Sequence, residues 1–153
     1  MPSILEASEK LSQDGVDGIK VEGFRPEVFN MLSQTNIEPW AHLGFTPQLI
    51  KNPAVQAKDE ASAEKLLTDS LSLEESGAVG IILELVPEIV AERISQALKI
   101  PVIGIGAGLK CDGQVQVWHD LIGLETRIYK HAMRLSNCSV SYTHLRAHET
   151  TDN

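Results

Sequence analysis

The sequence predicts an α/β fold organised around a parallel β-sheet. Segments with helical and strand-like patterns alternate along the 153 residues, and this alternation is typical of βα units whose strands pair in parallel. Two expected strands, GIILEL (80–85) and PVIGIG (101–106), are apolar at almost every position. Strands of this composition are usually buried on both faces, as they are in parallel sheets covered by helices.

The strongest helical pattern covers residues 59–76, with Asp59 as a plausible N-cap and Gly77 directly after the last turn. The preceding segment, 45–58, contains two prolines and is predicted to be a loop. The other expected helices are 2–13, 25–34, 87–99 and about 121–136, and the expected strands are 16–22, 38–44, 101–106 and about 114–118, with one more ending at Glu84.

Composition and charge restrict the class of protein. Hydrophobic residues make up 42% of the chain and charged residues 22%, as in an ordinary soluble domain. The net charge of −8 argues against nucleic acid or an anionic membrane as a partner, because no basic surplus exists to neutralise phosphates. No apolar run could span a bilayer and no secretory signal opens the chain. With no motif spacing between Cys111 and Cys138, we expect reduced thiols in the cytoplasm.

Two parallel architectures fit this pattern. One is an open, doubly wound sheet, and the other is a (βα)₈ barrel, which normally needs about 250 residues. The chain shows five expected strands, too few to close a barrel. Composition and periodicity do not decide between a small open sheet and a truncated barrel.

Polar and glycine-rich residues follow the expected strands at their carboxyl ends. In parallel α/β folds these ends meet at one edge of the sheet, where functional sites form. The residues concerned are Lys20 and Glu22, His42, Glu84, then Gly104, Gly106 and Gly108, and finally His119 and Asp120.

Each of the charged residues also has a structural interpretation. Glu84 lies three residues before Pro87, so it is also suited to the N-terminus of the next helix, where the dipole favours an acid. Lys20 and Glu22 point to one face of a strand and would equally form a surface ion pair. A lone His42 on an apolar strand is more often a hydrogen-bonded core residue than a catalyst.

The remaining features are less specific. The glycines of GIGAG (104–108) serve equally well for close packing of a helix on a strand. The segment lacks a full G-x-G-x-x-G and an acidic partner for a ribose, so a dinucleotide site is not expected. His119 and Asp120 are also suited to capping a helix.

Taken together, several segments resemble the ketopantoate hydroxymethyltransferase family in sequence and in order. The matching stretches cover residues 15 to about 124 and are GIKVEG (18–23), AHLGFTPQ (41–48), LTDSLSLEESGA (67–78), ILELVP (82–87), ALKIPVIGIGAG (97–108) and CDGQVQVWHDLIGL (111–124). The resemblance implies a (βα)₈ barrel, Mg²⁺, and transfer of a one-carbon unit from 5,10-methylenetetrahydrofolate to 3-methyl-2-oxobutanoate, giving 2-dehydropantoate for pantothenate and coenzyme A biosynthesis. It also implies a decamer-like homo-oligomer.

The resemblance assigns a role to four residues. Glu84 matches the catalytic proton acceptor, Lys20 matches the lysine that binds the oxoacid, His42 matches a histidine beside the substrate, and Glu22 matches an acid of the magnesium site. Removing the C3 proton of an oxoacid gives an enolate, whose charge Mg²⁺ can stabilise. Glu84 follows an apolar strand, so burial should raise its pKa toward neutrality, as suits a base.

The chain also departs from the family pattern. The family's first three strands, which carry two metal-binding aspartates and a substrate-binding serine, have no counterpart. We therefore expect a partial barrel of about strands 4–8 within residues 1–137, with little activity alone. The loop after the HLG-TPQ strand lacks the family's glycines. Residues 138–153 look like translated sequencing-adapter sequence, so we expect a non-native tail, and we do not expect its His144 and His148 to bind metal.

Two alternatives to this function remain at the level of sequence. The chain could be a non-catalytic barrel remnant that only folds or docks onto other subunits. It could also be another Mg²⁺-dependent oxoacid enzyme, of the phosphoenolpyruvate mutase type, although the HLG-TPQ and DGQVQVWHD stretches argue against that.

Overall fold

The structure, a computed structural model, describes residues 4–124 and 135–136. The chain forms two compact units, Met1–Gln114 and Val115–Asn153. The elements of the first unit are α1 (Ile4–Gln13), β1 (Gly18–Glu22), α2 (Pro26–Leu32), β2 (Glu38–Gly44), α3 (Glu60–Glu75), β3 (Gly80–Glu84), α4 (Glu88–Ala97), β4 (Val102–Ile105) and β5 (Gly113–Gln114); in the second unit, the described residues include α5 (Trp118–Leu121).

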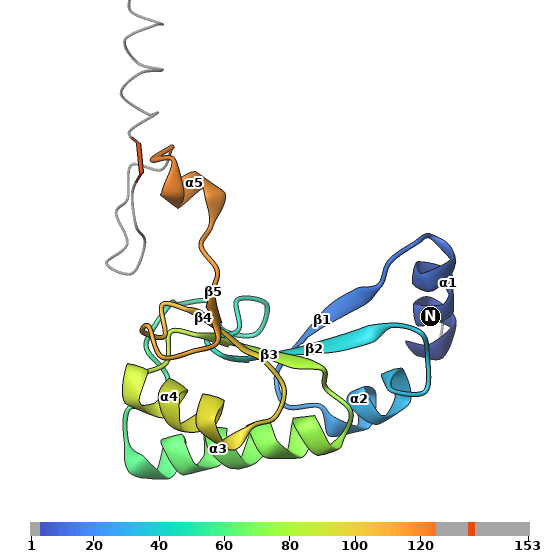
Figure 1. Ribbon diagram of the computed structural model, residues 1–153, viewed down its shortest axis with the longest axis horizontal. Helices are drawn as coiled ribbons and strands as arrows, with labels where there is room; N and C mark the ends of the chain where they lie inside the picture. Colours follow the sequence, from blue (N-terminus) through green and yellow to red (C-terminus); the bar gives the residue numbers. More distant parts are fainter. Residues whose placement is uncertain (1–3, 125–134, 137–153) are drawn as a thin grey trace, which may run out of the picture. The chain divides into compact units, whose positions relative to one another are not determined.

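The five strands form one parallel sheet in the order β1-β2-β3-β4-β5 (Figure 1). The α/β class and the parallel sheet predicted from the sequence are therefore confirmed. Each strand pairs with the next strand along the chain, whereas a doubly wound sheet reverses its strand order at a switch point. The sequential order is compatible with part of a (βα)₈ barrel.

Helix α3 forms where the strongest helical pattern predicted it. Asp59 is its N-cap: the Ser62 amide donates to Asp59 Oδ1 over 2.9 Å, and the Asp59 amide donates to Ser62 Oγ over 3.3 Å. Gly77 follows the C-cap with a left-handed φ of +101°, which a glycine adopts at little cost. The segment 45–58 before the helix contains no helix or strand, as predicted.

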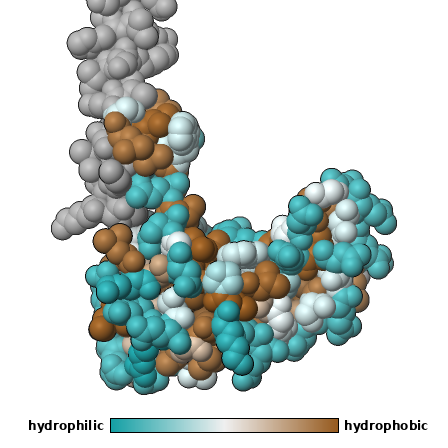
Figure 2. All heavy atoms as spheres, viewed as in Figure 1, coloured by the Kyte–Doolittle hydropathy of each residue, from teal (hydrophilic) through white to brown (hydrophobic). Residues whose placement is uncertain are grey.

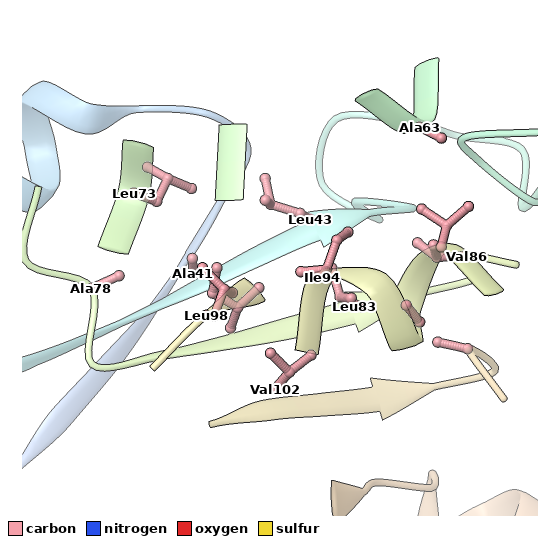
Figure 3. Close-up of a cluster of buried hydrophobic side chains, with 14 of the residues drawn as sticks. Ala41, Leu43, Ala63, Leu73, Ala78, Leu83, Val86, Ile94, Leu98 and Val102 are labelled. Carbon is pink, nitrogen blue, oxygen red and sulfur yellow. The ribbon is translucent and has the colours of Figure 1, made fainter. Parts of the chain in front are cut away.

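The hydrophobic core lies between one face of the sheet and the helices α3 and α4 (Figure 3). Leu73 of α3 and Ile94 of α4 are fully buried there. The sheet contributes the alternate positions Ala41, Leu43, Ile81, Leu83 and Val102, all less than 5% exposed. Burying a large aliphatic side chain contributes about 1.5–3 kcal/mol relative to leaving it in water, so this layer holds the unit together.

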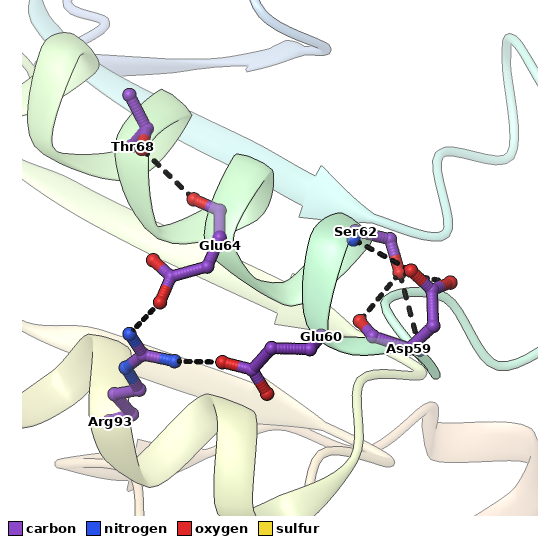
Figure 4. Close-up of polar contacts among 6 residues, drawn as sticks. All are labelled: Asp59, Glu60, Ser62, Glu64, Thr68 and Arg93. Carbon is purple, nitrogen blue, oxygen red and sulfur yellow. Dashed lines mark hydrogen bonds and ion pairs between the residues drawn. The ribbon is translucent and has the colours of Figure 1, made fainter.

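The two helices are also linked at the surface. Arg93 of α4 donates to Glu60 over 3.1 Å and to Glu64 of α3 (Figure 4). The outer side of these helices is largely hydrophilic in the view of Figure 2. This amphipathic arrangement is what the helical periodicity of a surface helix predicts.

The end of the sheet differs from the prediction. A strand at about 114–118 was expected, but β5 contains only Gly113 and Gln114, and residues 118–121 are helical. Val115, Val117 and Trp118 are 44%, 49% and 64% exposed, so the alternation of valines that predicted a strand here does not correspond to a buried face. Helix α5 ends at Leu121; most of the helix predicted at 121–136, Cys138 and the tail 138–153 lie outside the described residues.

Candidate active site

The sheet register aligns the carboxyl ends of the first three strands. Glu22 of β1 pairs with His42 of β2, and Gly44, two residues later, pairs with Glu84 of β3. Because side chains alternate along a strand, Lys20, Glu22 and His42 share the face opposite the hydrophobic core, and Glu84 lies on it too. The structure thus brings together the four residues singled out in the sequence.

Direct contacts join these four side chains into one cluster. Lys20 Nζ donates to Glu22 Oε1 over 3.1 Å and lies 2.8 Å from His42 Nδ1. On the other side of the imidazole, His42 Nε2 lies 3.1 Å from Glu84 Oε2. The side chains of Glu22 and His42 are 5% and 4% exposed, and those of Glu84 and Lys20 are 17% and 40% exposed. The cluster is therefore buried at its base and open on the side of Lys20.

The lysine contact fixes the histidine tautomer. A lysine ammonium can only donate, so His42 Nδ1 accepts and the ring proton of the neutral imidazole is on Nε2. That atom is buried and makes no aligned hydrogen bond, although the Glu84 oxygen lies 3.1 Å away. A bound molecule with an oxygen near Glu84 would give this N–H an acceptor.

The two carboxylates have opposite pKa shifts. Burial alone would raise the pKa of Glu22, but the Gln48 amide, which donates to Oε2 over 2.9 Å, and the ammonium of Lys20 together lower it below its usual range. Burial raises the pKa of Glu84, and the more distant Lys20 only partly opposes it. Glu22 is thus held as an anion, while Glu84 is closer to exchanging a proton near neutral pH.

His42 is kept neutral by its surroundings. Burial lowers its pKa first, the positive charge of Lys20 lowers it further, and Glu22 opposes both. A neutral imidazole beside Lys20 agrees with the tautomer that the contacts require. Between Lys20 and Glu84, His42 therefore acts as a neutral hydrogen-bonding group rather than as a second cation.

The backbone around Glu84 contains features that sequence reasoning missed. Leu85 has a left-handed φ of +50°, which is strained for a residue with a side chain. Its amide donates to Ile105 O over 2.9 Å, and its carbonyl accepts from the Gln56 amide over 2.8 Å. The carbonyl of Glu84 accepts from the Phe45 amide over 2.7 Å. The backbone of Glu84 and Leu85 is thus fixed by the adjacent strand and the 45–58 loop, and no sequence motif signals this.

The contacts can be compared with the purely structural roles that the sequence also allowed for Glu84, for Lys20 and Glu22, and for His42. The acid in the first turn of α4 is Glu88, with Pro87 at the N-cap, while Glu84 contacts His42. Lys20 and Glu22 do form an ion pair, but Glu22 is buried, so the pair is not confined to the surface. His42 is buried as a core histidine would be, yet only one ring nitrogen is hydrogen-bonded.

The other sequence candidates do not join the cluster. A Cβ on Gly104 would lie 3.0–3.1 Å from the side chains of Gln114 and Cys111, which supports close packing as the reason for that glycine. His119 and Asp120 do not cap a helix, because they lie within α5, whose N-cap is Val117 without a side-chain hydrogen bond. They belong to the second compact unit and are described only within it.

The described residues do not by themselves form a metal site. Within 4–124 and 135–136, no group of three or more His, Cys, Asp or Glu side chains is arranged to hold a metal ion. Both oxygens of Glu22 already accept hydrogen bonds, from Lys20 and Gln48. Mg²⁺ requires six oxygen ligands in near-octahedral geometry, and this carboxylate alone does not supply them. In the same part of the chain, no helix is long and apolar enough to cross a membrane.

The class of protein is an α/β protein with an enzyme-like site at the strand ends. It is defined by the sequential parallel sheet and by the buried cluster of acids, histidine and lysine at its carboxyl edge. The particular family follows from sequence comparison, since the profile of ketopantoate hydroxymethyltransferase matches residues 2–146. The chain belongs to this family.

Curated relatives support the assignment. The 3-methyl-2-oxobutanoate hydroxymethyltransferases of Chloroflexus aurantiacus and Gluconacetobacter diazotrophicus are 42% and 43% identical, over 86% and 88% of this chain and 48% and 50% of their own lengths. The enzyme of the same name from Bacillus pumilus is 44% identical over 79% of this chain and 45% of its own. The chain therefore spans about half the length of the curated relatives it matches.

A solved structure is also similar, at a level too low to carry an argument. It is a prophage protein of the dihydrodipicolinic acid synthase family from E. coli K12, in complex with pyruvate. It has a TM-score of 0.44 and 14% identity, and the match covers 65% of this chain and 36% of that one.

Proposed function

We propose that this chain contributes to an enzyme that transfers a hydroxymethyl group from 5,10-methylenetetrahydrofolate to 3-methyl-2-oxobutanoate, forming 2-dehydropantoate in cytoplasmic pantothenate and coenzyme A biosynthesis. The observation that carries the proposal is the 3.1 Å contact between Glu84 and His42, in a cluster that also contains Lys20. Membership of the family favours this reaction over that of a phosphoenolpyruvate mutase relative.

The proposed architecture is a partial (βα)₈ barrel. The five strands would correspond to about strands 4–8, which the sequential strand order and the half-length match to the relatives support. We also propose a homo-oligomer, as the family resemblance implies. The boundary of the barrel domain at residue 137 remains a prediction.

Glu84 is the proposed base. Its carboxylate would accept the proton from C3 of the oxoacid, and the electron pair of the broken C–H bond would move into the C2–C3 bond and onto the carbonyl oxygen as an enolate. C3 would then form a bond to the methylene carbon of the folate donor. The two C–N bonds of that carbon would break, water would supply the hydroxyl oxygen, and tetrahydrofolate would leave with protons on its nitrogens. The raised pKa of Glu84 supports this role, because a base with a pKa nearer the working pH transfers protons most effectively.

Lys20 and His42 are the proposed substrate-binding residues. A lysine ammonium has three donors, and the contacts to Glu22 and His42 use two of them. The third is suited to the substrate carboxylate, where a compact positive charge is favourable. The Nε2–H of His42 is suited to an oxygen of the substrate next to Glu84.

Mg²⁺ is proposed as a cofactor of the complete enzyme only. Glu22 is the candidate ligand in this chain, and since the described residues do not form a site, the other ligands would come from outside them. Lys20, His42 and Glu84 contact one another within the described residues, so their roles can be tested by substitutions in this chain.

The experiment is to measure exchange of the C3 proton of 3-methyl-2-oxobutanoate in D₂O by NMR, and hydroxymethyl transfer with the folate donor and Mg²⁺. Glu84→Gln should lower the exchange rate by about 10²–10⁴-fold, the usual contribution of a general base. Glu88→Gln, which alters an exposed acid of α4, is the matched control and should leave the rate unchanged.

Two results would contradict the proposal. Exchange that is equally fast in Glu84→Gln would exclude Glu84 as the base. A folded chain that catalyses neither exchange nor transfer, even when the N-terminal half of a relative is added, would instead support the non-catalytic barrel remnant.

A further inference from the structure

The face of the sheet that carries the charged cluster becomes apolar beyond Glu84. In the register of the sheet, Glu84 of β3 is paired with Ile105 of β4. Ile105 is a half-buried side chain and is not part of the hydrophobic core beneath the helices. Ile82, two residues before Glu84, is half-buried on the same face.

The side chains thus change from charged to apolar in the order of the strands. Lys20 comes from β1, His42 from β2, Glu84 from β3 and Ile105 from β4. Lys20 Nζ and Glu84 Oε2 lie on opposite sides of one imidazole ring, at 2.8 Å and 3.1 Å from its two nitrogens. A small molecule spanning these two groups would need a negative charge at one end and an apolar group near the other.

A branched 2-oxoacid has this polarity. Its carboxylate lies at one end, its carbonyl follows, and the C3 carbon that gives up the proton bears the alkyl groups. If Glu84 removes that proton, the alkyl groups are attached to the carbon nearest Glu84. They must then meet whatever lies next to Glu84 on this face, and the register places Ile105 there.

We propose that Ile105 determines the preference of this site for 2-oxoacids that are branched at C3. This inference rests on the proposed function, because it assumes that the substrate carboxylate is bound at Lys20 and the C3 proton is removed by Glu84. Contact between the alkyl groups and Ile105 would remove both apolar surfaces from water, which is the source of such a preference.

The test is the affinity of the chain for 3-methyl-2-oxobutanoate and for pyruvate, which lacks the branch, measured by calorimetry with Mg²⁺ present. The unmodified chain should bind the branched acid more tightly. In Ile105→Ala the ratio of the two affinities should fall about tenfold, the usual effect of methyl groups in an apolar pocket. Ile105→Val, which keeps the branched shape, should restore most of the ratio.

Ile103→Ala is the matched control. Ile103 is on the same strand and face, but it pairs with Ile82 and lies one step farther from the carboxyl edge. Its loss should lower stability and leave the affinity ratio unchanged.

The outcomes separate this inference from the proposed function. If oxoacids bind, and Lys20→Met weakens both acids equally, an unchanged ratio in Ile105→Ala would overturn the role of Ile105 alone. If the unmodified chain binds neither acid, even when the N-terminal half of a relative is added, both the inference and the proposed function are overturned.

Discussion

The two faces of the sheet differ in composition and in what they contribute. The face toward the helices carries small and aliphatic side chains such as Ala41, Leu83 and Val102, which are almost completely buried. The opposite face carries the charged cluster together with half-buried apolar residues such as Ile82. Since neighbouring residues on a strand alternate between the faces, a single strand such as β3 contributes to stability and to chemistry at consecutive positions.

Truncating Leu83 and Ile82 tests most directly whether the two faces of the sheet differ in their contribution to stability. Leu83→Ala should also give the largest loss of stability among these variants. Leu83 is 0% exposed, so Leu83→Ala should lower the free energy of unfolding by about 2–5 kcal/mol, through lost burial and the cavity left behind. Ile82→Ala should cost clearly less, because Ile82 is only half-buried. Chemical denaturation of both variants measures this, and equal losses would show that the faces are energetically alike.

Glu22→Gln is expected to have the next largest effect. The anion accepts hydrogen bonds from Lys20 and Gln48, so its removal at neutral pH should cost about 1–3 kcal/mol of stability. The pKa of Glu22 is lowered in the folded state, so this stabilisation is present above the ordinary value of 4.5 and is lost as pH falls through the folded pKa. Denaturation of both proteins at neutral and acid pH should show the difference shrinking in acid.

Glu84→Gln should increase the stability of the fold near neutral pH, where Glu22→Gln decreases it. The change should be smaller, because Glu84 is more exposed than Glu22. The pKa of Glu84 is raised in the folded state, so its ionisation destabilises the fold as pH rises from 4.5 through the folded pKa. The glutamine variant should therefore melt at a higher temperature than the unmodified chain near neutral pH, and at the same temperature in acid. A lower melting temperature at neutral pH would contradict the raised pKa.

Arg93→Ala should lower the stability of the fold least of these variants. Its ion pairs with Glu60 and Glu64 link the two helices that cover the core, α3 and α4 (Figure 4), but the arginine side chain is 43% exposed. Exposed ion pairs contribute little to stability, because water and salt screen the charges. A larger loss on denaturation, or one that persists in high salt, would mean that the helix-facing layer depends on these charges.

Much of the fold could be predicted because its signals are local. Strand β2 begins and ends at the predicted residues 38 and 44, and the predicted N-cap of α3 is present. The end of the sheet could not be predicted in this way. Val115 and Val117 alternate like strand residues, but whether such a segment becomes a strand depends on a partner, and beyond Gln114 no pairing with β4 is present among the described residues.

The convergence of the four site residues could also be predicted, because parallel strands end at one edge. The details that set their chemistry could not. The amide of Gln48 on Glu22 and the lysine contact that fixes the tautomer of His42 depend on the path of a loop and on side-chain rotation. Neither contact produces a pattern in the sequence from which it could be predicted.

The end of β3 also has a consequence for tolerance to mutation. Gly44 and Leu85 both have left-handed backbones, with φ of +83° and +50°. A Cβ on Gly44 would lie 2.3 Å from the carbonyl oxygen of Glu84, so a saturation library should recover only glycine there. At Leu85 the same library should accept glycine and asparagine, which adopt this conformation most easily, and should reject valine and isoleucine. Two positions with left-handed backbones would thus differ in tolerance, because only the one at Gly44 lacks room for a Cβ.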